Sequence, residues 1–232
     1  MITVYYGAFS ERRQSPEYCH EPEPVLNTLF DSLEIEPNDG LRKCPAFTGV
    51  FKNTFKVKSS YDYNLTWDGK NFTSMMYDQS FFDSTVLLRE SNKGIVSYLN
   101  PGIYFYADCD KLELEMTTPI YEKNMMYDGI IIPGKYDCAN HFRRLECSLK
   151  LKAPQTINIH DEGTLYYVKF HTEEKIKLVR FHVTHDIFTL TNSLLYYRNH
   201  TSKLTPLDWY YGVMKKHYNK KLLKLIKQNI IN

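Results

Sequence analysis

The strongest strand pattern in the chain lies at residues 163–184 and reads GTLYYVKFHTEEKIKLVRFHVT. Apolar and polar side chains alternate along residues 166–171 and again along 178–183, which is the period of a strand with one buried face. The charged residues 173–175 between the two runs fit a turn, so we expect an antiparallel hairpin. Burying both apolar sets on one face requires residue numbers across the hairpin to sum to about 347.

This register would bring five side chains together on the other face of the hairpin: Tyr167, Lys169, His171, Arg180 and His182. Lys and Arg bind anions, and neutral imidazoles bind metals or move protons. A solvated strand face is the simplest interpretation, and an anion- or ligand-binding face is the functional alternative. We expect no metal site, because no HxH or HxxxH spacing fixes a ligand geometry here.

Strand-like runs continue along most of the preceding sequence. Residues 55–58 and 61–67 alternate apolar and polar side chains, and shorter runs lie near 81–88, 95–99, 103–107, 112–116, 129–132 and 145–151. Gly- and Pro-containing turns separate them. This spacing predicts a mainly β fold, either a sandwich or a β-clip-like barrel, and disfavours a parallel sheet with crossover helices.

Helical spacing is found near both ends of the chain. Apolar residues recur at helical spacing over 23–33 and predict an N-terminal helix, with Pro24 in its first turn. Thr205, Pro206 and Asp208 form a capped start for a basic amphipathic helix that runs to about residue 229. The content is therefore α+β, and we divide the chain into an N-terminal strand–helix segment (1–40), a principal β domain (41–190) and a C-terminal helical segment (191–232).

Charge is concentrated in the C-terminal segment. The whole chain carries +2, too little for a dedicated duplex binder, whereas residues 203–232 hold seven Lys and one Asp. The candidate partner-binding residues of the expected helix are Trp209, Lys215, Lys216, Lys220, Lys221, Lys224 and Lys227. Docking on the β domain or contact within an oligomer is the favoured interpretation; binding to another partner, including nucleic acid through residues 206–232, and attachment to a membrane surface are the alternatives.

Signatures of catalysis and of export are absent from the sequence. There is no GxSxG, SxxK, Walker or dinucleotide motif, so we predict neither a catalytic residue nor a cofactor. Five widely spaced cysteines argue against a disulfide framework, and we expect them to be free. No apolar stretch approaches transmembrane length, and the amino end lacks a signal-peptide pattern.

Three segments carry a resemblance to a known group: CPAF at 44–47 followed by KNTF at 52–55, GTLYYVKF at 163–170, and KIKLVRF at 175–181. Together they resemble uncharacterised proteins of tailed bacteriophages, especially large marine and cyanobacterial phages. This resemblance implies a viral origin and brings no established activity. Residues 157–165 show a weaker, fold-level likeness to the dUTPase and dCTP deaminase superfamily, which implies a β-clip, although its Ser- and Gly-rich phosphate motifs have no counterpart here.

We therefore expect a phage accessory or virion-associated protein that is not an enzyme and acts through protein–protein contacts. Its partners would be phage proteins, host proteins or a second copy of the chain, and it would lie in the cytoplasm of the infected cell or in the virion, not outside the cell. One alternative is a small-molecule or nucleotide-handling enzyme, or a ligand-binding protein, that uses the polar face of residues 163–184. A second alternative is contact with nucleic acid through the Lys-rich helix.

Overall fold

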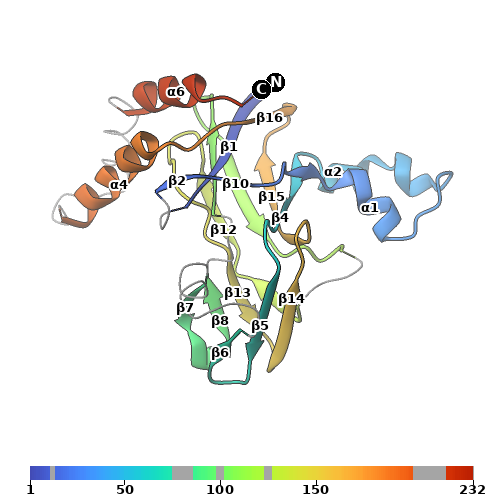
Figure 1. Cartoon of the computed structure of the whole chain (residues 1–232). Coiled ribbons are helices and arrows are strands. Elements are labelled where there is room, and N and C mark those ends of the chain that lie inside the picture. The colour runs from blue at the N-terminus through green and yellow to red at the C-terminus, as the bar shows by residue number, and fades with distance from the viewer. Residues whose placement is uncertain (11–13, 75–85, 98–101, 123–126, 201–217, 232) are drawn as a thin grey trace.

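The computed structural model describes residues 1–10, 14–74, 86–97, 102–122, 127–200 and 218–231, and these form a mainly β, α+β structure (Figure 1). Four separate sheets make up the β part, and none of them closes into a barrel within these ranges. The predicted fold class is thereby confirmed. None of the described helices is long and apolar enough to cross a membrane.

The first sheet, called the β1 sheet, is built around β1 (Ile2–Ser10). β9 (Ile103–Ala107) pairs with β1 antiparallel, β16 (Ile176–Arg180) pairs with it in parallel, and β2 (Ser15–Glu17) pairs antiparallel with its end. Residues 4–9 of β1 are all buried, because the main core covers one face of the strand and helices cover the other.

A five-stranded antiparallel sheet, called the β15 sheet, forms the middle of the molecule. Its strand order is β12 (Gly134–Asp137), β10 (Glu113–Thr117), β15 (Thr164–His171), β4 (Thr54–Lys58) and β3 (Glu23–Pro24). Two smaller sheets complete the core, in the orders β14 (Gln155–Ile159), β5 (Tyr63–Trp67), β6 (Phe72–Thr73) and β11 (Gly129–Ile131), β13 (Ser148–Leu151), β8 (Ile95–Ser97), β7 (Leu87–Glu90).

The predicted alternation is confirmed in β5 and is wrong in β4. In β5, Tyr63, Leu65 and Trp67 are buried while the residues between them are half-buried. In β4 residues 54–57 are all buried, including Lys56, which was expected to face water. The difference arises because β4 lies inside its sheet, where helical segments cover its second face. The strand expected at 81–88 and the turn at 100–102 lie mostly outside the described residues.

The hairpin predicted for residues 163–184 is wrong. β15 pairs with β10 and β4, and β16 leaves that sheet to pair with β1. Residues 165–168 of β15 are buried on both faces, which is typical of a central strand whose two edges are both occupied. The two strands therefore share no register, and no single polar face is formed from them.

Two helices cover the outer face of the β1 sheet (Figure 1). They are α4 (His185–His200) and α6 (Asn219–Gln228), and they pack on a second apolar cluster that includes Tyr5, Phe9 and Phe142. α4 was not predicted from the sequence. Its signal is Thr184, an N-cap residue whose hydroxyl accepts a hydrogen bond from the amide of Ile187. Of the helix expected from residue 206, the part before residue 218 lies outside the described ranges.

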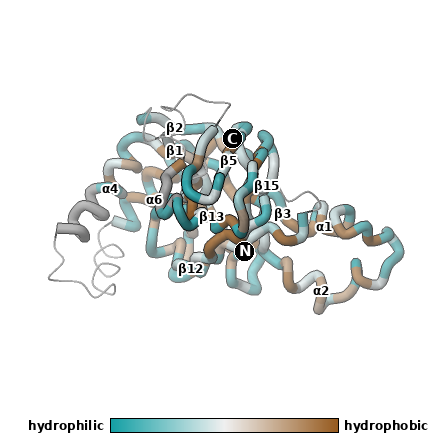
Figure 2. The backbone as a smooth tube through the Cα atoms, turned by 90° about the horizontal axis from the view of Figure 1, so that it is seen from below, coloured by the Kyte–Doolittle hydropathy of each residue, from teal (hydrophilic) through white to brown (hydrophobic). Residues whose placement is uncertain are grey.

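A third feature is a helical arm, residues 26–50, that projects from the side of the β15 sheet (Figures 1 and 2). It contains α1 (Leu26–Ser32), the short 3-10 helix η1 (Gly40–Lys43) and α2 (Pro45–Val50). A second 3-10 turn, η2 (Ser91–Lys93), lies elsewhere, between β7 and β8. The predicted N-terminal helix is present but begins at Leu26, because Glu23 and Pro24 pair with β4 as β3.

Candidate functional site

Three of the five residues predicted to form an anion-binding face lie on one face of β15. Tyr167 is buried, and its hydroxyl donates a 2.7 Å hydrogen bond to Oε1 of Glu122. Lys169 donates to the carbonyl of Val50 at 2.8 Å, and Nε2 of His171 lies 2.6 Å from a carboxylate of β10. These contacts attach the arm and neighbouring strands to β15.

Of the other two predicted residues, Arg180 ends β16 in the β1 sheet and His182 follows that strand. The guanidinium of Arg180 lies over the ring of Tyr18, 4.9 Å from its centroid, beside the buried thiol of Cys19. Burial raises the pKa of Cys19 to about 11, and the positive charge of Arg180 opposes this shift. The side chain of His182 is exposed, and its amide donates to the carbonyl of Asn229. The structure therefore separates Arg180 and His182 from the β15 residues.

A buried ion pair lies where the arm joins the β15 sheet. The ammonium of Lys56, a residue that is 5% exposed, is 2.7 Å from Oε1 of Glu122, the same oxygen that accepts from Tyr167. Burial, together with the hydrogen bond to the carboxylate, raises the pKa of Tyr167. Nothing in the sequence pattern distinguished Lys56 from the exposed lysines of other strands.

The arm has very little core of its own. Within α1, η1 and α2, all of which the structure describes, Leu29 is the one fully buried side chain. Leu33, Leu41 and Val50 are 38%, 43% and 52% exposed. Acidic side chains lie along the same segment, at Asp31, Glu34, Glu36 and Asp39. A projecting apolar surface with a polar border is typical of a protein-binding site.

Arg42 holds the arm in shape. Its guanidinium donates to the carbonyls of Glu36 and Ile35, at 3.0 and 2.7 Å, and lies 4.5 Å from the centroid of the Phe30 ring. These contacts hold the loop between α1 and η1 closed. The loop has no hydrophobic core of its own.

We expect Arg42→Ala to loosen this loop and to leave the β sheets intact. Two carbonyls lose a charged donor, so the free energy of local opening should fall by about 1–3 kcal/mol. Hydrogen exchange of the amides of residues 35–44 measures this effect. The neighbouring exposed Lys43→Ala is the matched control and should leave exchange unchanged; equal exchange in the two variants would contradict the role given to Arg42.

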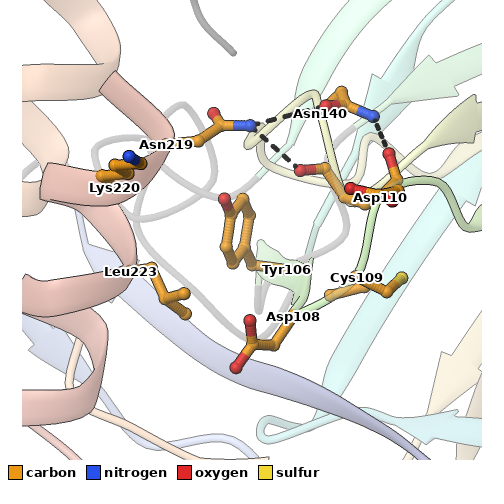
Figure 3. Close-up of a pocket in the computed structure, with 10 residues that line it drawn as sticks. Tyr106, Asp108, Cys109, Asp110, Asn140, Asn219, Lys220 and Leu223 are labelled. Carbon is orange, nitrogen blue, oxygen red and sulfur yellow. Dashed lines mark hydrogen bonds between the residues drawn. The ribbon is translucent and has the colours of Figure 1, made fainter. Parts of the chain in front are cut away.

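A pocket of about 520 Å³ lies between α6 and the end of β9 (Figure 3). Its walls come from α6, from the loop that follows β9 and from the turn that follows β12. The lining residues are Tyr106, Ala107, Asp108, Cys109, Asp110, Ala139, Asn140, Asn219, Lys220 and Leu223. Its volume lies in the range of small-molecule sites.

Asp137 organises one wall of this pocket. Its Oδ1 accepts from the amides of Leu112 and Ala139, at 3.1 and 3.0 Å, and its Oδ2 accepts from Nδ2 of Asn140 at 2.7 Å. Asn140 also donates to the carbonyl of Asp110 at 2.7 Å. The turn is therefore tied to the loop that follows β9.

The charges at the pocket are partly paired. Asp108 forms an ion pair with Lys227 of α6 at 2.8 Å, and this contact raises the pKa of Lys227. Asp110 and Lys220 are exposed, and neither has an ion-pair partner among the described residues. Burial raises the pKa of Tyr106, whose ring stands between them (Figure 3), and that of the Cys109 thiol. At neutral pH both groups are therefore protonated.

The structure places four of the residues predicted for the C-terminal helix. Lys220, Lys221, Lys224 and Lys227 all lie exposed on α6, whereas Trp209, Lys215 and Lys216 lie outside the described residues. The opposite side of α6 buries Leu222 and Ile226 against the β1 sheet. Of the alternatives considered from the sequence, docking on the β domain describes this part of the helix. The position of Lys220 in the lining of a pocket was not predictable from the helical pattern.

Comparisons with protein-family models, with curated proteins and with solved structures find no match for this chain. All five cysteines are free, and three of them, Cys19, Cys138 and Cys147, are buried. In the described part of the chain, no group of three or more His, Cys, Asp or Glu residues is placed to hold a metal ion. The features that indicate a function are therefore the arm, the lysines of α6 and the pocket.

Proposed function

We propose that the chain acts through protein–protein contacts, and that its partner is a second copy of itself, bound by the arm of one copy against α6 of the next. The exposed apolar arm is the observation that carries this proposal. The resemblance of three segments to tailed-phage proteins supports an assembly that works in the phage particle or in the infected cell.

A second copy of the chain is proposed as the partner because the charges of the arm and of α6 are complementary. The arm surrounds its exposed apolar side chains with the carboxylates of residues 31, 34, 36 and 39. α6 presents Lys221 and Lys224 to solvent, outside the lining of the pocket, and neither has an ion-pair partner among the described residues. Opposite charges that meet across an interface set its orientation and speed association.

The positions of the two surfaces determine the kind of assembly. The arm and α6 lie on opposite sides of the β sheets in both views (Figures 1 and 2), so they cannot meet within one copy. A contact between two different surfaces that is not reciprocated by the same partner joins copies head to tail, and it produces a ring or an open filament.

Sedimentation of the purified full chain over a range of concentrations tests this proposal. We expect reversible association that weakens as salt is raised, and a loss of affinity of about tenfold or more when Lys221 and Lys224 are both changed to Glu. Changing Glu34 and Glu36 to Lys should weaken association to the same degree. A mixture of the two variants should associate again, because the unaltered arm of the helix variant meets the unaltered α6 of the arm variant.

The control is a charge reversal of matching size at Lys175 and Lys177, which are exposed and belong to neither surface. This variant should associate as the unmodified chain does. A chain that stays monomeric at its highest soluble concentration contradicts self-association, and so does a mixture of the two charge-reversed variants that does not recover affinity. Recovery of that monomeric chain in purified phage particles would instead indicate a different protein partner.

A further inference from the structure

We propose that the pocket between α6 and the end of β9 binds a small zwitterion, an α-amino acid or a short peptide, with its ammonium group at Asp110 and its carboxylate at Lys220. The pocket uses Asn219, Lys220 and Leu223 of α6, whereas the proposed self-association uses Lys221 and Lys224 of the same helix. Three features support this assignment: the distribution of charge in the pocket, its apolar centre and the hydrogen bonds that hold its walls.

Two charged residues that line the pocket have no ion-pair partner in the part of the chain that the structure describes; they have opposite signs and lie on opposite walls. Asp110 belongs to the loop after β9, Lys220 belongs to the first turn of α6, and Figure 3 shows them on either side of the Tyr106 ring. The third lining charge, Asp108, is neutralised by Lys227 at 2.8 Å. A ligand that satisfies both unpaired groups must itself carry a cation and an anion at its two ends.

The same distribution disfavours other classes of ligand. A nucleotide or a sugar phosphate would bring at least two negative charges to a pocket with one unpaired lysine and two carboxylates, and like charges repel. A metal ion would find one unpaired carboxylate, fewer than the number of ligands that calcium or zinc requires. A zwitterion adds no net charge and leaves neither Asp110 nor Lys220 without a partner.

The middle of the pocket suits an apolar side chain. Tyr106, which is 3% exposed, forms its floor, with Ala107, Ala139 and Leu223 around it. Such a surface contributes binding energy through the burial of a hydrocarbon side chain, while Asn140 and Asn219 offer polar groups at the edge. We therefore expect leucine- and phenylalanine-like ligands to bind more tightly than glycine.

Both walls are held in place before a ligand arrives. Asp137 fixes the turn that carries Asn140. Nδ2 of Asn219 in α6 lies 3.4 Å from the carbonyl of Ala139 and 3.5 Å from Oδ1 of Asn140, so the helix is linked to that turn. Binding in such a site loses little free energy to the ordering of side chains.

Calorimetric titration of the full chain with L-leucine, leucinamide and N-acetyl-leucine tests the assignment, since each derivative lacks one of the two charges. We expect leucine to bind at least about tenfold more tightly than either derivative. Lys220→Met should remove the preference for leucine over leucinamide and keep the preference over N-acetyl-leucine. Asp110→Asn should do the reverse.

Lys177→Met is the control, because Lys177 is also an exposed lysine, does not line the pocket and belongs to neither self-association surface. It should leave all three affinities unchanged, and thermal melting of each variant shows whether it is folded. Two results would overturn the proposal: the absence of saturable binding of leucine, phenylalanine and the dipeptide Leu-Leu up to about 10 mM, or equal effects of Lys220→Met and Lys177→Met.

Discussion

Replacement of Phe170 by alanine is expected to lower the free energy of unfolding by about 3–5 kcal/mol. Phe170 is 1% exposed, and its ring makes edge contacts with Phe55 of β4 and Phe105 of β9, each at 5.8 Å between centroids. It therefore joins the β15 sheet to the β1 sheet. Its removal leaves a cavity between the two, and the expected loss is a large share of the about 5–15 kcal/mol by which domains are stable.

Equilibrium unfolding in urea measures this effect. The midpoint should fall while the slope of the transition stays constant, since the surface exposed on unfolding changes little. Ile120→Ala is the control: Ile120 is 62% exposed, and its loss should change stability by no more than about 0.5 kcal/mol. A Phe170→Ala variant within that range of the unmodified chain would show that the two sheets do not share a core.

Removal of the ammonium group from Lys56 is expected to destabilise the chain by about 3 kcal/mol or more in the variant Lys56→Met. The carboxylate of Glu122, whose side chain is 17% exposed, would then keep the hydrogen bond from Tyr167 and lose its counter-charge at a site that water reaches only in part. Because the pair is screened from solvent, the loss should be nearly the same at low and high salt.

The double variant Lys56→Met with Glu122→Gln separates the charge from the packing. The amide oxygen of Gln still accepts from Tyr167, so this variant should recover more than half of the lost stability. Thermal or urea unfolding of Lys56→Met, of Glu122→Gln alone and of the double variant gives the coupling free energy between the two side chains. If the losses of stability in the two single variants add up in the double variant, Lys56 and Glu122 do not stabilise the chain as an ion pair.

The strand periodicity of the middle of the chain was predictable, and the pairing of those strands was not. Tyr63, Leu65 and Trp67 are buried as the period of two requires, because β5 has one solvated face. Leu165–Val168 of β15 are buried on both faces, and this continuous apolar run is the local sign of a central strand. Assigning β15 to a simple hairpin ignored that sign in favour of the general tendency of neighbouring strands to pair.

The candidate sites were less predictable than the fold, because they depend on contacts between distant segments. Tyr167 lies among the polar residues of the alternating pattern of β15, so it was expected to face water. It is buried because the arm packs against it. Asp110 and Lys220 meet across one pocket although 110 positions separate them in the sequence. By contrast, the apolar side of α6 follows the spacing of Leu222 and Ile226, so its docking was open to prediction.

The central position of β1 affects how the protein is made. Val4 pairs with Ala107, and Ile2 pairs with Ile176, so β1 leaves the ribosome well before β9 and β16, two of the strands that pair with it. Until then, a strand with six successive core residues is exposed in a nascent polypeptide. Long-range pairing of this kind slows folding and exposes a segment that aggregates readily. Expression in a host is therefore governed as much by chaperone capacity and growth temperature as by the stability of the finished protein.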